Sequence, residues 1–99
     1  MTADKVREVL NVYKKKLDEM GVPKERFSRD LIPTSRKEFL AHCRAMLDEM
    51  ETLIQQGRMD KVFRWLGFVQ GCLWSAGCYD LESLKNHNRP DPPDFRGHE

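Results

Sequence analysis

The chain has 99 residues, 39% hydrophobic and 33% charged, so it has room for one small domain with a modest core. Its 17 basic and 16 acidic side chains leave a net charge of +1, which argues against a dedicated nucleic-acid-binding protein because such proteins carry a clear basic excess. Three cysteines and a charged N-terminus without an apolar signal-peptide core indicate reduced thiols and a cytoplasmic protein.

The N-terminal stretch has the pattern of an amphipathic helix. Thr2 is a suitable N-cap, and the apolar residues that follow recur every three or four positions on one narrow stripe. They are Val6, Val9, Leu10, Tyr13, Leu17 and Met20. Gly21 is the expected stop, so the sequence predicts a first helix over residues 3–20.

Residues 21–34 are expected to form a connection, because Pro23 and Pro33 restrict its two ends. A short helical turn over 24–30 is an open alternative. Three apolar side chains of this segment are expected to pack against the helices: Phe27, Leu31 and Ile32.

The next stretch predicts the longest helix, over residues 36–56. Ser35 and Glu38 fit a capping box, in which the serine caps the helix and the glutamate reaches back. Apolar residues then follow at helical spacing over five turns, while the opposite face carries His42, Arg44 and Asp48. Arg44 and Asp48 are four apart and are expected to form an ion pair.

Two further helices are predicted after Gly57. Only Gly57 to Asp60 separates the second helix from the next apolar run, which is short enough to make the helices on either side antiparallel neighbours. The third helix is expected over 59–76, and a short fourth over 80–86 with Asp80 as its cap. The predicted fold is therefore an all-α, small antiparallel helical bundle of three main helices plus a short fourth. It forms a single domain over 1–88, followed by a disordered tail over 89–99.

The third predicted helix is apolar on nearly all sides. A buried helix of a soluble protein is favoured over a membrane span, because the uncharged run from Trp65 to Tyr79 has only 15 residues and a bilayer needs about 20. At about 100° per residue, one face collects aliphatic side chains that suit a core seam. They are Val62, Leu66, Val69, Leu73 and Ala76.

The opposite face of this helix carries a row of small residues between aromatic rings. Gly67 and Gly71 each cost about 1 kcal/mol relative to alanine, so close approach of another backbone is the expected compensation. We expect a homo-oligomer with this face near the interface, the alternative being that another part of the same chain covers it. The residues expected at this contact are Phe63, Gly67, Phe68, Gly71, Trp74 and Ser75.

No catalytic, metal or cofactor signature occurs in the sequence, which favours a non-enzymatic protein. Arg64 and Gln70 are conspicuous because they stand in an otherwise apolar helix. One interpretation is structural, with Arg64 paired to Asp60 and Gln70 bonded to a neighbouring helix. The other is a pocket for an anionic ligand, a nucleotide or a nucleic acid, whose possible residues are Arg64, Gln70, Asn86 and Arg89.

The stretch RWLGFVQGCLW, with Gly57-Arg58 before it and Asn88-Arg89-Pro90 after it, resembles a group of small uncharacterised proteins of tailed phages, prophages and their bacterial hosts. The resemblance covers about a third of the chain and implies an accessory phage-type protein without a known activity. Together with the apolar face, it favours a protein-interaction module whose partner is a second copy or an unidentified host or phage protein. Nucleic acid is the less expected partner.

Overall fold

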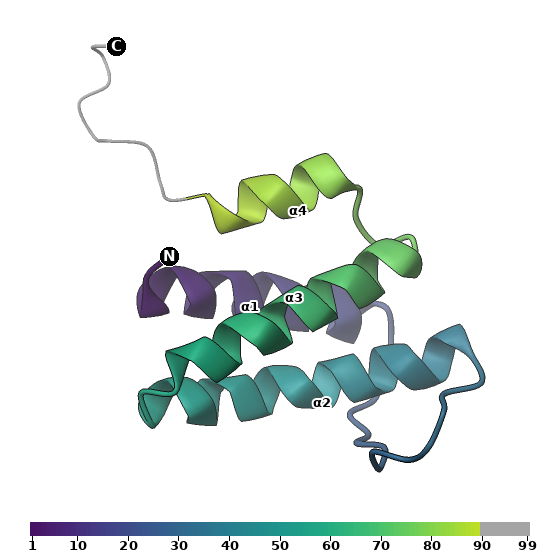
Figure 1. Cartoon of the computed structure of the whole chain (residues 1–99). Coiled ribbons are helices and arrows are strands. Elements are labelled where there is room, and N and C mark those ends of the chain that lie inside the picture. The colour runs from purple at the N-terminus through teal and green to yellow at the C-terminus, as the bar shows by residue number, and fades with distance from the viewer. Residues whose placement is uncertain (90–99) are drawn as a thin grey trace.

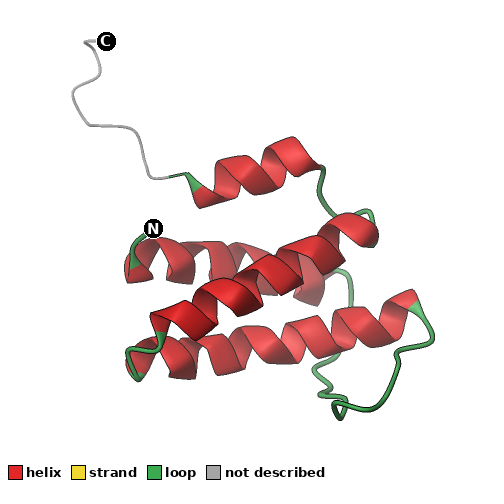
Figure 2. Cartoon of the chain, viewed as in Figure 1, coloured by secondary structure: helices red, strands yellow, loops and turns green. Residues whose placement is uncertain are grey.

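The structure is a computed structural model that describes residues 1–89. Within these residues it is all-helical, with four α-helices and no strand (Figures 1 and 2). The helices are α1 (Ala3–Glu19), α2 (Arg36–Gln55), α3 (Met59–Ser75) and α4 (Leu81–Asn88). The predicted boundaries are correct to within one or two residues. The disordered tail expected over 89–99 lies outside the described residues except for Arg89, which caps the C-terminal end of α4.

Short polar side chains begin three of the helices. Thr2 and Asp80 accept hydrogen bonds from the backbone of α1 and α4, as predicted. Ser35 caps α2 by accepting from the backbone N–H of Glu38. The carboxylate of Glu38 reaches one residue further back than a capping box requires, because it accepts from both the N–H and the hydroxyl of Thr34.

The three long helices end in the same way, at a glycine in the left-handed conformation. At the tightest connection, Gly57 has φ 75° and the following Arg58 N–H donates to the carbonyl of Leu53. This Schellman arrangement uses carbonyls that the helix would otherwise leave unpaired, and it lets α3 start two residues after the glycine. The stop signals in the sequence are therefore true helix ends.

The core lies where α2 packs against both α1 and α3, with α4 packed on α1 (Figure 1). Its fully buried side chains come from all three long helices and include Tyr13, Leu17, Leu47, Met50 and Leu73. One buried residue contradicts the predicted polar face of α2. Arg44 is only 4% exposed, because its guanidinium lies against α1 instead of pointing to solvent.

The connection over residues 21–35 is not helical, which settles the alternative of a short helix at 24–30. It is held along α2 by two hydrogen bonds that its backbone donates, from Glu25 N–H to the carbonyl of Ala41 and from Phe27 N–H to Nδ1 of the His42 side chain. Phe27 is half-buried as expected. The expectation for Leu31 and Ile32 was wrong: both are exposed, Ile32 to 85%, because the segment leaves the helices after Phe27.

Candidate functional site: the groove along α3

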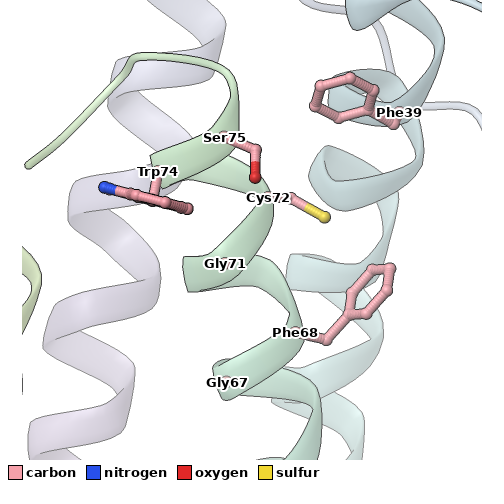
Figure 3. Close-up of a pocket in the computed structure, with 7 residues that line it drawn as sticks. All are labelled: Phe39, Gly67, Phe68, Gly71, Cys72, Trp74 and Ser75. Atoms are coloured by element: carbon pink, nitrogen blue, oxygen red, sulfur yellow. The ribbon is translucent and has the colours of Figure 1, made fainter. Parts of the chain in front are cut away.

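An open apolar groove of about 530 Å³ runs along the outer face of α3. Its floor is the backbone at Gly67 and Gly71, where a missing Cβ leaves the helix surface low. Figure 3 shows Trp74 on one side of this floor and Phe68 and Phe39 on the other. Ser75 and Cys72 complete the lining. The six residues that the sequence placed at a close contact thus include five that line one groove.

The two glycines have no close neighbour among the described residues. A Cβ built on Gly67 or Gly71 meets no atom within 4 Å apart from the adjacent residues and the backbone of α3 itself. The close approach that the sequence predicted is therefore not made by any described part of the same chain. The aromatic rings beside the glycines are also open to solvent, with Phe63, Phe68 and Trp74 exposed to 42, 54 and 52%.

The opposite side of α3 behaves as its periodicity predicts. Val62, Leu66, Val69 and Leu73 are buried in the core, and Trp65, Cys72 and Ala76 lie half-buried beside them. The helix is therefore two-sided, with one face in the core and one face uncovered. Phe39 is the first of the apolar residues that recur at helical spacing in α2, but it is only half-buried and forms part of the groove wall.

The four residues singled out for ligand binding do not come together. Arg64 is exposed and lies 3.7 Å from the carboxylate of Asp60, as the structural interpretation expected. Gln70 is buried and bonds to α1 and α4. Asn86 lines a separate shallow pocket, and Arg89 is exposed at the end of α4.

Gln70 is the centre of a polar network that holds α4. Its amide nitrogen donates to the hydroxyl of Tyr13 at 3.0 Å and to Oδ1 of Asn88 at 2.7 Å, and its oxygen accepts from Asn88 at 3.0 Å. The hydroxyl of Tyr13 lies 2.9 Å from Nδ1 of His87. Burial raises the pKa of Tyr13 to about 12, although the bond from Gln70 opposes the rise. The network therefore holds α4 against α1 and α3.

All three cysteines are free thiols. A hydrogen bond from Cys43 lowers the pKa of Cys72, whereas the same contact and burial raise the pKa of Cys43. Within residues 1–89, no group of three or more His, Cys, Asp or Glu side chains could hold a metal ion. The described helices also include none that is long and apolar enough to cross a membrane.

Comparison with known proteins found no matching protein-family model, curated protein or solved structure. The groove is therefore characterised by its own shape and chemistry. That chemistry is a glycine floor and aromatic walls. Such a surface offers van der Waals contact and apolar burial.

Proposed function

We propose that the protein is a non-enzymatic interaction module that binds another protein surface through the α3 groove, and that a second copy of the chain is one occupant. The observation that carries this proposal is the open space over Gly67 and Gly71 between exposed aromatic rings. Two mid-helix glycines lower helix stability by about 1 kcal/mol each, and nothing within the described chain uses the space that they create.

A helix is the occupant that this floor suits best. Removing Cβ atoms lets two helix backbones approach more closely than the usual 8–10 Å, which adds contacts along both helices. The flanking rings would then lose their water contacts, and burial of aromatic surface is the main source of affinity in protein interfaces.

The face is also complementary to itself. If two α3 helices meet through their glycine faces, antiparallel about a two-fold axis at the level of Val69 along the helix, Gly67 of each copy comes level with Gly71 of the other. The same operation sets Phe63 of one copy within about one residue rise, 1.5 Å along the axis, of Trp74 of the other. A two-fold axis pairs every contact twice, so these rings would be covered at both ends of the groove. The proposed assembly is thus a homo-oligomer of small antiparallel helical bundles.

The biological setting that we propose is that of an accessory protein of the phage or prophage type, acting in the cytoplasm. The RWLGFVQGCLW stretch supports the first part, because the residues of the resemblance include the whole floor of the groove. Three free thiols support the second part, because reduced cysteines are typical of that compartment. An unidentified host or phage protein would use the same groove.

The proposal is tested by how the melting temperature depends on protein concentration. Self-association stabilises the native state by mass action, so the melting temperature of the wild type should rise with concentration. A Cβ added at Gly71 meets no neighbouring atom within 4 Å, so Gly71→Leu should fold normally, fill the floor and lose this dependence. Lys15→Leu, on an exposed position of α1, is the matched control and should keep it. Two results together would refute the proposal. The melting temperature of the wild type would not depend on concentration, and no partner would be recovered by the wild type that Gly71→Leu fails to recover.

A further inference from the structure

A second, differently charged pocket adjoins the groove. Phe68 lines both, and on its other side the pocket of about 340 Å³ is formed by α2, α3 and the 21–35 connection. Its other lining residues are Arg26, Arg29, His42, Met46, Lys61 and Trp65. It therefore combines three cations with three rings.

Two of the three cations have no carboxylate partner in the part of the chain that the structure describes. Arg26 is paired with Glu49, and its guanidinium also lies 5.5 Å from the ring centre of Trp65. Lys61 lies 5.2 Å from the same ring centre and forms no ion pair with a described residue. Arg29, which lines this pocket and the smaller one beside it, has no ion pair or hydrogen bond within residues 1–89. With Glu49 counted, the pocket carries a net positive charge.

His42 adds a neutral donor whose orientation is fixed. Its Nδ1 accepts a hydrogen bond of 3.0 Å from the backbone N–H of Phe27, so the ring proton must reside on Nε2. Burial, with the nearby Arg26, lowers the pKa of His42, which keeps the ring neutral around pH 7. An N–H group in a cationic pocket is suited to an oxyanion.

The rings define a flat apolar side of the pocket. Phe68 is half exposed, and its ring meets that of His42 edge-on with ring centres 6.5 Å apart. Trp65 already has two cations near its ring, so Phe68 is the ring most open for a flat ligand. Stacking on an aromatic ring tolerates any nucleobase, because every base has a π-face.

We propose that this pocket binds the phosphate and base of a nucleotide, either free or within single-stranded nucleic acid. The phosphate would bind to Arg29 and Lys61, with Arg26 exchanging between Glu49 and the ligand, and the base would lie on Phe68. The inference does not rest on the proposed function of the groove, because none of its cations lines that groove. The two sites share Phe68, so a protein chain that covers this ring and a base that stacks on it would exclude each other.

The test is a fluorescence titration of Trp74→Phe protein, in which Trp65 is the single tryptophan. The probes are inorganic phosphate, AMP, hexaglutamate and a single-stranded oligothymidylate. We expect saturable quenching by AMP at a concentration at least about tenfold below that needed for phosphate or hexaglutamate, since only AMP adds a base to stack. Oligothymidylate that binds more tightly than AMP and weakens steeply with salt would indicate nucleic acid as the source, and equal binding would indicate a free nucleotide.

Charge-matched variants separate this site from general electrostatic attraction. Arg29→Ala with Lys61→Ala should weaken AMP binding by at least about tenfold, because each removes a charge-assisted contact to phosphate. Lys15→Ala with Lys85→Ala removes two exposed cations elsewhere and should leave binding within about twofold. Phe68→Leu should weaken AMP and leave phosphate unchanged. The proposal is overturned if no probe quenches saturably, if phosphate or hexaglutamate binds as tightly as AMP, or if both double variants lose affinity equally.

Discussion

Arg44 of α2 donates two parallel hydrogen bonds to the carboxylate of Asp18 of α1, from Nε at 2.7 Å and from Nη2 at 3.2 Å. Its third nitrogen donates to Asp48 at 3.3 Å, four residues along its own helix. The arginine is almost fully buried while both carboxylates remain accessible to water. It therefore links α1 to α2 at the edge of the core with the planar fork that only arginine offers.

Replacing this arginine should loosen the contact between α1 and α2. We expect Arg44→Lys to lower the free energy of unfolding by about 1–3 kcal/mol, since lysine cannot donate to both carboxylate oxygens of Asp18 and also to Asp48. Urea denaturation measures the change. Lys37→Met, on an exposed position of the same helix, should have an effect within about 0.5 kcal/mol. Equal effects of the two variants would show that the fork contributes nothing to stability.

The same cluster should make the protein sensitive to acid. Burial raises the pKa of Asp48, but hydrogen bonds from Lys24, Arg44 and Lys14 outweigh this effect and hold it at about 2. A carboxyl whose pKa is lower in the folded state stabilises the fold fully above its unfolded pKa near 4, and this stabilisation is lost as the pH falls towards 2. Urea midpoints of wild type should thus fall between pH 4 and 2. Asp48→Asn should show a shallower fall, and parallel curves would contradict the assignment.

Removing the amide of Gln70 should release α4 before the rest of the fold. Gln70→Leu keeps the volume but leaves the Asn88 amide without its partner and removes one of the two bonds of the Tyr13 hydroxyl, which should cost about 1–3 kcal/mol. Hydrogen exchange should accelerate in residues 81–88 more than in α2. Gln55→Leu, at an exposed position of α2, is the control. Uniform exchange along the chain would show that the network does not hold α4 in particular.

The docking of α4 should also weaken in mild acid. The hydroxyl of Tyr13 accepts from Gln70 and lies 2.9 Å from Nδ1 of His87. With the neutral tautomer that leaves Nδ1 free of a proton, the hydroxyl donates its own proton to this nitrogen. Burial, and then the charge of Lys5, lower the pKa of His87. A histidine with a lowered pKa in the folded state stabilises the fold above its unfolded pKa of about 6.5 and loses this contribution as the pH falls below it.

The measurement is the melting temperature of wild type and His87→Gln between pH 7.5 and pH 5. Wild type should lose stability across this range, and the variant, whose amide does not titrate, should lose less. His42 also has a lowered pKa and titrates in the same range, so His42→Gln is measured in parallel. An identical pH dependence of wild type and His87→Gln would contradict the role given to His87.

The sequence predicts the helices well because their signals are local. Thr2, Ser35 and Asp80 cap helices through bonds to residues only three positions away, and Gly57 ends one through its own backbone conformation. Local signals do not predict the exposure of Ile32, because whether this side chain is covered depends on where the connection runs in space. The burial of Arg44 is not predicted for a similar reason, since Asp18, against which it packs, lies 26 residues away in the sequence.

At the candidate site too, local sequence signals predict some features, whereas others depend on how the helices pack. The periodicity of α3 predicts which side of the helix carries Gly67 and Gly71, and the structure has that side uncovered. It cannot predict that Phe39 completes the wall, because this depends on how α2 and α3 pack. Nor can it group Arg26, Arg29 and Lys61, which are brought together by the path of the connection along α2. Arg64 and Gln70 stood out in sequence, but the two interact with different partners.

The central claim is that the open glycine face of α3 is covered by another protein chain, and the molar mass of the purified protein tests it most directly. Light scattering across a concentration series, extended to at least about 100 μM to detect micromolar self-association, should give at least twice the chain mass of 11.7 kDa for wild type. Gly71→Leu should give the mass of one chain under the same conditions. A wild-type mass of 11.7 kDa at every concentration would contradict self-association through this face.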